Sequence, residues 1–356
     1  MVDLKNYVCV APFLNMEIHN RNNLMCCGSW LTKELPNGVG YDMDLWNSEE
    51  AQEIRKSVMD GSYRHCLKNQ CPYLSLLTNM GDVNYTGPIA RRDKLDPTVK
   101  KWVDEGLTIL PHGPEYIQFA FDRTCNYWCP SCRKGLIAAS GEEIDESERK
   151  IKELTKNYGP NVRQIYITGS GDPFVSVPFR NFLRNFIPSE YPKLERIHLH
   201  TNASRWTKEM WDSMPNIHKY VKTCEVSIDA GTKETYENVT RLGGKWDVLM
   251  KNLEFINTIP SIFYISTSFV VQSSNYKEMS TFLELMKSIF GKKVRVFFSR
   301  INNWGSFTDE EYEKVQIWNI NHPEYNEFIK EYNKVVLDPQ VTTNMHELIE
   351  IKKSLF

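Results

Sequence analysis

Three cysteines near the middle of the chain have the spacing of ligands to a metal centre. Cys125, Cys129 and Cys132 fall within eight residues, in the pattern C-x3-C-x2-C. Three thiolates on one short loop can bind three irons of a 4Fe-4S cluster and leave the fourth iron open, whereas an electron-transfer cluster or a structural zinc site takes a fourth ligand nearby. No fourth ligand follows within this loop. We therefore favour a cluster with an open iron over two alternatives, a zinc site completed from elsewhere and three inert thiols.

Five further cysteines near the N-terminus predict a second metal site. They are Cys9, Cys26, Cys27, Cys66 and Cys71. Four thiolates fit either a fully ligated 4Fe-4S cluster or a structural zinc knuckle, and the spacing alone does not distinguish the two. Because adjacent cysteines rarely bind one cubane together, one member of the adjacent pair is expected to be spare. The remaining cysteine, at position 224, is expected to be an inert buried thiol.

Composition and charge exclude several classes of protein. The chain has 356 residues, of which 41% are hydrophobic and 25% charged, as in ordinary globular proteins. Its formal net charge of -2 argues against a general nucleic-acid binder. No apolar run approaches the ~20 residues of a transmembrane helix, and the first residues are too polar for a secretory signal. We therefore expect a cytoplasmic protein, and in that reducing compartment clustered cysteines more often bind metal than form disulfides.

The cysteine loop needs a scaffold, and the sequence after residue 115 predicts one. Short β-rich runs alternate there with helical stretches, which indicates βαβ units and a parallel sheet, either doubly wound or closed toward a barrel. The predicted strands are Tyr116–Phe121, Gln164–Thr168, Arg196–Thr201, Cys224–Ile228, Ile262–Val271 and Val294–Ser299. The predicted helices are Asp145–Tyr158, Val177–Phe186, Lys208–Met214, Lys233–Ile259 and Tyr276–Phe290. Parallel β/α folds carry their chemistry at the carboxyl ends of the strands.

The N-terminal cysteines flank a predicted helix. Asn47 with Glu50 three residues later fits a helix cap, and Gly61 fits the end of the helix. We therefore expect a helix from about Ser48 to Asp60, which could fold back and bring the two groups of cysteines together. The looser segment from 72 to 112 is punctuated by glycines and prolines, which predicts a connection to the main domain.

The central cysteine motif, directly after the first predicted strand, resembles the signature of the radical S-adenosylmethionine (radical SAM) superfamily. The resemblance covers roughly residues 115–305 and implies a partial (β/α)6 TIM-like barrel. It also implies that the amino and carboxylate groups of S-adenosylmethionine chelate the open iron, and that one-electron reduction yields a 5′-deoxyadenosyl radical that abstracts a substrate hydrogen. The family often has an aromatic residue before the last cysteine, where this chain has Ser131. Tyr127 or Trp128 would then supply the aromatic contact near the adenine.

Motifs after the second and third predicted strands also resemble elements of this family. Gly169, Ser170, Gly171 and Asp172 resemble its Gly-Gly-Glu-Pro segment. Glycines allow close backbone approach to the cofactor, and the acidic residue would face the cofactor's ammonium group. Asn202 lies in a Thr-Asn-Ala segment that resembles the family's Thr-Asn-Gly. It is a predicted polar contact to the cofactor, and an asparagine that caps a turn is the alternative.

Further matches follow the fourth and sixth predicted strands. Ser227 and Asp229 lie in a Ser-hydrophobic-Asp segment, with Arg241 downstream. By resemblance, Ser227 and Arg241 bind the carboxylate of S-adenosylmethionine, and Asp229 lies by the ribose or the substrate. Ser227 and Asp229 share one face of a strand, so both can point into one cavity. Ile301 and Asn302 are the predicted contacts to the adenine.

The N-terminal cysteines resemble the auxiliary-cluster modules, called SPASM or twitch domains, of one branch of the superfamily. Such a module usually follows the barrel, and here it precedes it. The resemblance implies one auxiliary 4Fe-4S cluster, with a zinc knuckle as the alternative. The predicted domains are an auxiliary cluster module (1–75), a connection (76–114), a radical SAM partial barrel (115–305) and a C-terminal helical extension (306–356).

The resemblance implies an enzyme, a radical SAM oxidoreductase or maturase. After hydrogen abstraction the substrate would be oxidised, epimerised or cross-linked. A peptide or protein is the preferred substrate class, and dehydrogenation or epimerisation of a sugar- or alcohol-type substrate is the alternative. An external electron donor, flavodoxin or ferredoxin, is implied as a partner, whereas neither nucleic acid nor a membrane is expected.

The rival from another class is a non-catalytic iron–sulfur or zinc protein with a redox or interaction role. Such a protein would have little use for three cysteines without a fourth beside them. A methyltransferase with the same cofactor would need a methyl-accepting cysteine or a cobalamin domain, and the sequence shows no evident extra domain. His198 and His200 alternate with apolar residues along the third predicted strand, and we expect satisfied barrel residues rather than catalysts.

Overall fold

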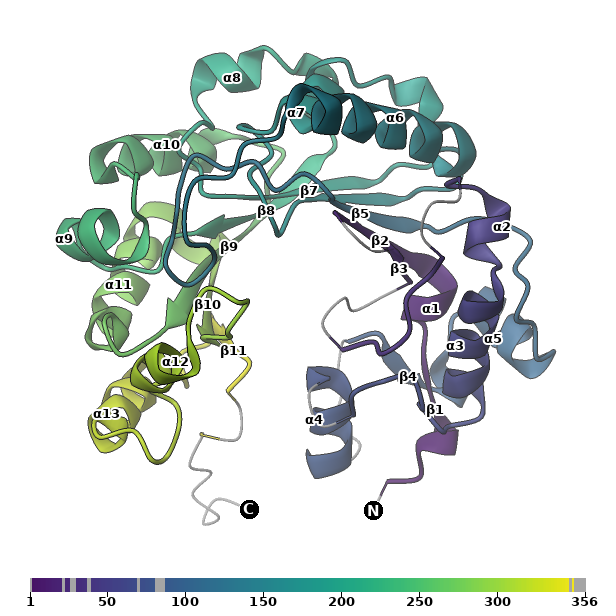
Figure 1. The fold of residues 1–356 in the computed structure, drawn as a ribbon, viewed down its shortest axis with the longest axis horizontal. Helices are drawn as coiled ribbons and strands as arrows, with labels where there is room; N and C mark the ends of the chain where they lie inside the picture. The colour runs from purple at the N-terminus through teal and green to yellow at the C-terminus, as the bar shows by residue number, and fades with distance from the viewer. Residues whose placement is uncertain are drawn as a thin grey trace. The chain divides into compact units, whose positions relative to one another are not determined.

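The computed structural model, whose helices and strands are labelled in Figure 1, describes residues 2–20, 23–25, 30–36, 40–68, 71–80, 87–345 and 348. The chain divides into two compact units, each built from three segments. Unit 1 comprises Met1–Asp122, Ser140–Ile167 and Ile187–Arg196, and unit 2 comprises Arg123–Ala139, Thr168–Phe186 and Ile197–Phe356. The sequence predicted consecutive domains instead, because periodicity identifies elements but not the elements that pack together.

The sheet of unit 1 has the spatial order β6-β5-β2-β3. β5 (Tyr116–Ala120) and β6 (Gln164–Ile167) are the first two predicted strands, and they pair in parallel. β2 (Asn15–His19) also pairs in parallel with β5, and β3 (Asn23–Leu24) pairs antiparallel with β2. The N-terminal segment, which we assigned to the cysteine module, therefore also contributes a strand to the sheet that precedes the cysteine loop.

Unit 1 also contains several α-helices and a separate pair of strands among its described residues. They are α1 (Ala11–Leu14), α2 (Met43–Trp46), α3 (Glu49–Met59), α4 (Pro72–Met80), α5 (Pro97–Asp104), α6 (Gly141–Tyr158) and the antiparallel pair β1 (Tyr7–Cys9) and β4 (Ile89–Arg91). α3 confirms the predicted helix, and Gly61 follows its end with φ of 75°. The cap is Ser48 and not Asn47, because the side chain of Asn47 instead accepts a hydrogen bond from the backbone of Leu110 at 2.9 Å.

Arg55 on α3 is fully buried, and backbone carbonyls hold it. Its guanidinium donates to the carbonyl oxygens of Pro12 at 2.9 Å, Trp46 at 2.8 Å and Thr108 at 2.7 Å. It also donates to Asn47 Oδ1 at 3.1 Å and lies 4.6 Å from the centre of the Trp46 ring. One side chain therefore joins three separate segments of unit 1.

Replacing this arginine by methionine (Arg55→Met) is expected to lower the free energy of unfolding by about 3 kcal/mol or more. The substitution leaves three carbonyl oxygens without the hydrogen-bond donor that Arg55 supplies, and each unsatisfied group costs ~1–3 kcal/mol. Chemical denaturation measures the difference. The control is Arg64→Met, since Arg64 is a surface residue whose partner is the exposed Asp60. Its expected effect is within ~0.5 kcal/mol. A loss in Arg55→Met no larger than that of the control would show that the carbonyls do not need the guanidinium.

The sheet of unit 2 consists of parallel strands in the spatial order β7-β8-β9-β10-β11. The strands are β7 (Arg196–Thr201), β8 (Val221–Ser227), β9 (Tyr264–Val271), β10 (Val294–Arg300) and β11 (Val341–Thr343). Four of them match predicted strands. β11 lies in the C-terminal stretch that we predicted to be helical, and that prediction was wrong there because a strand of three residues is too short to show a periodic pattern.

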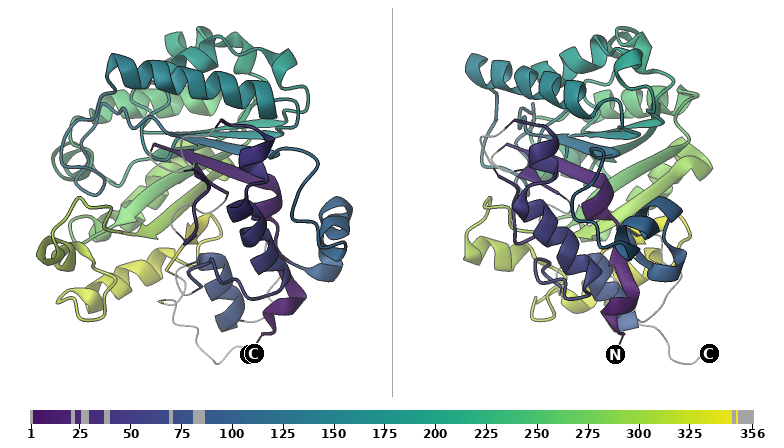
Figure 2. Two further views of the ribbon diagram at one scale, coloured as in Figure 1. Left: turned by 45° about the vertical axis from the view of Figure 1, so that its right-hand side comes forward. Right: turned by 90° about the vertical axis from the view of Figure 1, so that its right-hand side faces the viewer.

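The helices of unit 2 connect these strands. They are α7 (Val177–Arg184), α8 (Lys208–Asp212), α9 (Lys233–Thr235), α10 (Trp246–Thr258), α11 (Met279–Phe290), α12 (Asp309–Val315) and α13 (Tyr325–Val335). Figures 1 and 2 show helices of this unit along one face of its strands. Each strand from β5 to β10 is followed in the chain by a helix, which confirms the predicted α/β class with the repeats of a partial TIM-like barrel. No helix within the described ranges is long and apolar enough to cross a membrane.

The helix predicted over Lys233–Ile259 is interrupted. α9 continues into a π-helical turn over Tyr236–Thr240, and α10 begins only at Trp246. Gly243 lies between them with φ of 91°, and a Cβ atom at this position would lie 2.8 Å from a ring carbon of Trp128. The break therefore brings the backbone against the cysteine loop, and π-helical turns of this kind are frequent at functional sites.

Candidate active site

The loop that carries the central cysteines follows β5 and is fixed at several points. The Cys125 amide donates to the carbonyl of Ile137 at 3.0 Å. The carbonyl of Thr124 accepts a hydrogen bond from the Asp172 amide at 2.9 Å, which connects the loop to the glycine-rich segment. The Trp128 amide donates to the carbonyl of Leu242 at 3.2 Å, within the break that precedes α10. The loop is thus held from both sides within unit 2.

Two arginines direct N–H groups at two of the three thiols. Arg133 donates to Cys132 Sγ from Nε at 3.4 Å and from Nη2 at 3.3 Å. Arg241 donates to Cys129 Sγ from Nη1 at 3.5 Å. Positive charge beside sulfur stabilises a thiolate, because hydrogen bonds to an ionised acceptor are the strong ones.

The third thiol has an amide donor that a buried carboxylate positions. Asn202 donates to Cys125 Sγ from Nδ2 at 3.6 Å. The carboxylate of Asp172 is fully buried, and its Oδ2 accepts from the backbone N–H of Asn202 at 2.9 Å and from Thr201 Oγ1 at 2.7 Å. Its other oxygen accepts from the Phe174 amide at 3.0 Å. We predicted that this carboxylate faces an ammonium group of a ligand. In the structure its partners are protein groups, and it orders the segment that carries Asn202.

Burial opposes ionisation of the thiols in the protein as it stands. It raises the pKa of Cys125 to about 11, and the Asp172 carboxylate adds to the effect. Burial also raises the pKa of Cys129, although the guanidinium of Arg241 opposes it. Both thiols are therefore protonated at neutral pH, and a metal centre that binds here must displace their protons.

The glycine-rich segment turns back sharply after β6. Thr168 has φ of 74° and Gly169 has φ of 134°, so the backbone adopts conformations that L-residues rarely take. The hydroxyl of Thr168 accepts from the amides of Ser170 at 3.1 Å and Gly171 at 2.8 Å. The carbonyl of Ser170 accepts from Arg133 Nη2 at 2.6 Å, so the arginine beside the cysteines also ties down this turn.

Asp229 and Arg241 form a buried ion pair at the carboxyl end of β8. Asp229 Oδ2 lies 2.7 Å from Arg241 Nη2, and the two side chains are only 2% and 11% exposed. The Val270 amide donates to the other Asp229 oxygen at 2.8 Å. Burial is the largest single influence on Arg241 and lowers its pKa, but the Asp229 carboxylate, Cys129 and Tyr236 act together against it and raise that pKa overall. The guanidinium therefore stays charged, between Asp229 and the thiol of Cys129.

Ser227, the other predicted residue of this strand, belongs to a polar cluster. Its Oγ lies 2.8 Å from His200 Nε2 and accepts from Ser268 Oγ at 3.2 Å. Glu225 Oε1 lies 3.6 Å from the same histidine nitrogen. His198 Nδ1 likewise lies 2.7 Å from a hydroxyl, that of Thr223. The sequence motifs identified Ser227 but not His200 or Glu225 as site residues. The alternation of histidines with apolar residues in β7 was the available signal, because it indicates that one face of this strand is polar.

The residues predicted to contact an adenine differ in how exposed they are. Tyr127 is buried, and its hydroxyl lies 3.1 Å from that of Tyr236. Trp128 is 37% exposed, which leaves part of its ring accessible. The carbonyl of Ile301 accepts from the Tyr312 hydroxyl at 3.0 Å, and Asn302 is exposed.

Three of the N-terminal cysteines lie around one pocket of unit 1. Cys9, Cys66 and Cys71 line it together with Trp30 and Tyr63. Burial raises the pKa of Tyr63, and the neighbouring thiols of Cys9 and Cys66 add to the effect. The two adjacent cysteines at 26 and 27, predicted as further ligands, lie outside the described residues. The described part of the chain holds no group of three or more His, Cys, Asp or Glu placed to hold a metal ion. A cubane does not need ligands gathered on one ion, because each of its thiolates binds a different iron.

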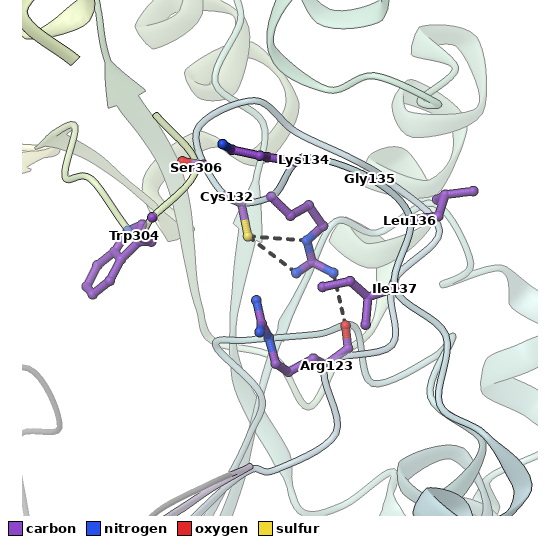
Figure 3. Close-up of a pocket in the computed structure, with 10 residues that line it drawn as sticks. Arg123, Cys132, Lys134, Gly135, Leu136, Ile137, Trp304 and Ser306 are labelled. Carbon is purple, nitrogen blue, oxygen red and sulfur yellow. Dashed lines mark hydrogen bonds between the residues drawn. The ribbon is translucent and has the colours of Figure 1, made fainter. Parts of the chain in front are cut away.

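A cavity of about 330 Å³ lies beside the central cysteine loop, and Cys132 is part of its wall (Figure 3). Its lining comes from two stretches of unit 2, the loop after β5 that carries the cysteines and the loop after β10. The residues are Arg123, Cys132, Arg133, Lys134, Gly135, Leu136, Ile137, Trp304, Gly305 and Ser306. Arginine and lysine are the charged residue types among them. Sequence reasoning missed Arg133 and this cavity, because an arginine next to a cysteine carries no pattern of its own.

The fold and the site define a class of protein with β/α repeats in which three thiols lie on the loop after the first repeat strand. Residues 121–286 match the model of the Radical SAM superfamily, and the chain carries a domain of this superfamily. No curated protein matches the sequence significantly.

Solved structures with some similarity to this chain include two of SuiB from Streptococcus suis. The structure bound to S-adenosylmethionine has 17% sequence identity and a TM-score of 0.44, over 69% of this chain and 54% of that chain. The structure bound to the precursor peptide SuiA has 16% identity and a TM-score of 0.45, over 82% and 65%. Native anSMEcpe with bound AdoMet has 15% identity and a TM-score of 0.40, over 62% and 61%. The chain thus spans about half the length of the first of these structures.

The donor set on the cysteine loop fits the cluster that this superfamily implies. Thiolates are the ligands that iron–sulfur clusters take, and hydrogen bonds to their sulfur atoms are among the features that tune such clusters. Here each of the three sulfur atoms has an N–H donor from the protein. Two of the donors are arginines, so the site can compensate the negative charge of three thiolates.

Proposed function

We propose that this protein is a radical SAM enzyme. The observation that carries the proposal is the loop of Cys125, Cys129 and Cys132, in which each thiol faces an N–H donor and no fourth ligand follows. When bound, a 4Fe-4S cluster and S-adenosylmethionine supply reductive cleavage of the sulfonium and a radical that takes a hydrogen atom from the substrate. The loop cysteines would hold three irons of that cluster.

The other residues of the site have distinct proposed roles. Arg133 and Asn202 donate to cluster thiolates, and Arg241 donates to Cys129 while its ion pair with Asp229 keeps it in place. Ser227 offers a hydroxyl at the end of β8, two residues before Asp229. The predicted cofactor contacts remain our proposal and are Tyr127, Trp128, Gly169, Ser170, Gly171, Asn202, Ser227, Asp229, Arg241, Ile301 and Asn302. For Asp172 we propose a positioning role, because its oxygens accept from protein groups.

We further propose one auxiliary 4Fe-4S cluster on the N-terminal cysteines. The shared pocket of Cys9, Cys66 and Cys71 supports it, since residues far apart in sequence meet there. One of the two adjacent cysteines, Cys26 or Cys27, would be the fourth ligand. A zinc ion on the same thiolates is the alternative, and metal analysis of the protein distinguishes them.

For the substrate we propose a peptide or protein, which an oxidoreductase or maturase of this kind would oxidise, epimerise or cross-link. The resemblance of the N-terminal cysteines to auxiliary-cluster modules supports this class, and a sugar- or alcohol-type substrate is the alternative. We propose a cytoplasmic location, because reduced cysteines and iron–sulfur centres suit a reducing compartment. The electron would come from a flavodoxin or ferredoxin.

The test of the proposed function is anaerobic reconstitution of the full chain with iron and sulfide, followed by S-adenosylmethionine and dithionite. We expect 5′-deoxyadenosine, and about eight irons per chain when both clusters form. A protein that retains stoichiometric zinc and no iron would overturn the proposal. So would an iron-loaded protein that does not bind S-adenosylmethionine in equilibrium dialysis.

The hydrogen bonds to Cys132 predict a measurable effect of Arg133 on the cluster. Arg133→Met keeps much of the side-chain volume but removes both N–H donors to Cys132. We expect ~10–100-fold faster loss of iron to a chelator, because hydrogen-bond donors to the ligands of a metal site typically have effects of this size. Arg123→Met is the control, because Arg123 offers its carbonyl rather than its guanidinium to this network. Equal rates of iron loss in the two variants would contradict the role of Arg133.

A further inference from the structure

The cavity beside Cys132 is an unassigned feature at the edge of the proposed site. Cys132 contributes to its wall, so a molecule seated there would lie next to the metal centre that this thiol would hold. Figure 3 shows Leu136 and Ile137 on one side and Trp304 on the other, with the Cys132 sulfur between them and the Lys134 side chain extending toward Ser306. The cavity is therefore formed by two loops of unit 2 around a prospective ligand atom.

The cavity is positively charged. Arg123, Arg133 and Lys134 line it, and no carboxylate is among its lining residues. Arg133 is engaged with Cys132, but Arg123 and Lys134 have exposed side chains without a carboxylate at ion-pair distance in the described part of the chain. Lys134 lies near Glu311: hydrogen bonds from Thr308 lower the pKa of Glu311, and the lysine adds to that effect. A binding partner for this surface would carry negative charge.

Two large apolar side chains flank the basic groups. Leu136 and Trp304 are both 63% exposed, although both are residues that normally pack in a core or an interface. Exposed apolar groups beside polar ones mark interaction surfaces, and tryptophan is frequent at the centre of protein interfaces. A small anion would bind to the basic groups alone, whereas a protein with an acidic surface would contact both the basic groups and the apolar side chains.

The proposed chemistry consumes one electron per reductive cleavage, and the electron must come from outside the chain. We propose that the cavity and its rim, formed by Arg123, Lys134, Leu136 and Trp304, are the docking surface for an acidic one-electron donor protein of the flavodoxin or ferredoxin type. This inference rests on the proposed function. In the transfer the reduced donor would lose one electron and the centre that Cys132 would help to hold would gain it, with no covalent bond formed or broken. An acidic group of the substrate is the competing occupant, and the test below separates the two.

The test compares two reductants on the iron-loaded full chain with S-adenosylmethionine. One is a reduced bacterial flavodoxin, and the other is saturating dithionite, which needs no docking surface. For Arg123→Glu/Lys134→Glu we expect the flavodoxin-driven rate of 5′-deoxyadenosine formation to fall about 10-fold or more at low ionic strength, because charge complementarity governs such encounters. The loss should shrink as salt is added. The dithionite-driven rate and the iron content should match those of the wild type.

Two further variants sharpen the comparison. Lys251→Glu/Lys330→Glu carries the same change of net charge on exposed lysines outside the cavity, and it should keep the flavodoxin-driven rate. Trp304→Ala should lower that rate with little dependence on salt, since it removes apolar contact area rather than charge.

Three outcomes would overturn the docking surface. The first is a wild type that works with dithionite but not with flavodoxin, and the second is an unchanged flavodoxin-driven rate in Arg123→Glu/Lys134→Glu. The third is an equal loss with both reductants, which would assign the cavity to the substrate or the cofactor. A wild type that forms no 5′-deoxyadenosine with dithionite would overturn the proposed function itself, and the inference with it.

Discussion

Replacement of Cys125, Cys129 and Cys132 together by alanine is expected to abolish 5′-deoxyadenosine formation by the reconstituted protein. Bound iron should fall from about eight to about four per chain, because the thiols around the N-terminal pocket would still hold one cluster. The effect is large because this loop offers no substitute ligand for any of its three thiolates. Colorimetric iron analysis and chromatography of the nucleoside products measure the two changes on one sample.

Cys224→Ala is the matched control for this triple variant. Cys224 is fully buried in β8, and burial raises the pKa of its thiol, which suits an inert core residue. We expect full iron content and full 5′-deoxyadenosine formation in this variant. If the triple variant instead retained all its iron, the central loop would hold no cluster. If Cys224→Ala lost iron, the lone thiol would have a role that its position in the core does not suggest.

Asp229→Asn is expected to lower the free energy of unfolding by about 3–5 kcal/mol, the usual cost of leaving one partner of a buried ion pair uncompensated. The guanidinium of Arg241 would keep its charge but lose the carboxylate at 2.7 Å. Denaturation of the protein without its clusters, followed by circular dichroism, measures this cost without a contribution from the metal centre.

The double variant Asp229→Leu/Arg241→Met tests whether the cost comes from the unpaired charge. Removal of both charges together should recover a large part of the lost stability, since apolar residues often replace a buried ion pair at little cost. The double variant should also lose S-adenosylmethionine binding, because it removes the guanidinium proposed to contact the cofactor. A double variant that is less stable than Asp229→Asn would show that the pair stabilises the fold through its geometry.

Many residues of the candidate site could be named from the sequence, because cysteine spacing and strand ends follow simple rules. The six predicted strands all exist, with boundaries within a few residues. The three loop cysteines, Asn202 and Arg241 were named from motifs, and the structure brings them together. Asp172 was named for the same reason, but its carboxylate bonds to the protein because full burial leaves it no other partners.

What the sequence could not predict depends on contacts between distant segments. The place of β2 beside β5 depends on pairing, and a strand of five residues carries no mark of its partner. The break before α10 was hidden because the flanking turns continue a helical pattern, and only the close approach of Gly243 to Trp128 explains it. Arg133 was missed because its importance comes from two acceptors, Cys132 and Ser170, that meet only in three dimensions.

The position of β2 has a consequence for how the protein is made. Met16 pairs with Ile117, a separation of 101 positions (117 − 16), so β2 has no parallel partner until synthesis has passed β5. Closing so long a loop costs entropy before the contact repays it, and non-local pairing of this kind slows folding. On the ribosome the nascent N-terminal segment therefore exposes one open strand edge together with reduced cysteines, and this interval is when the chain is most open to aggregation and to oxidation.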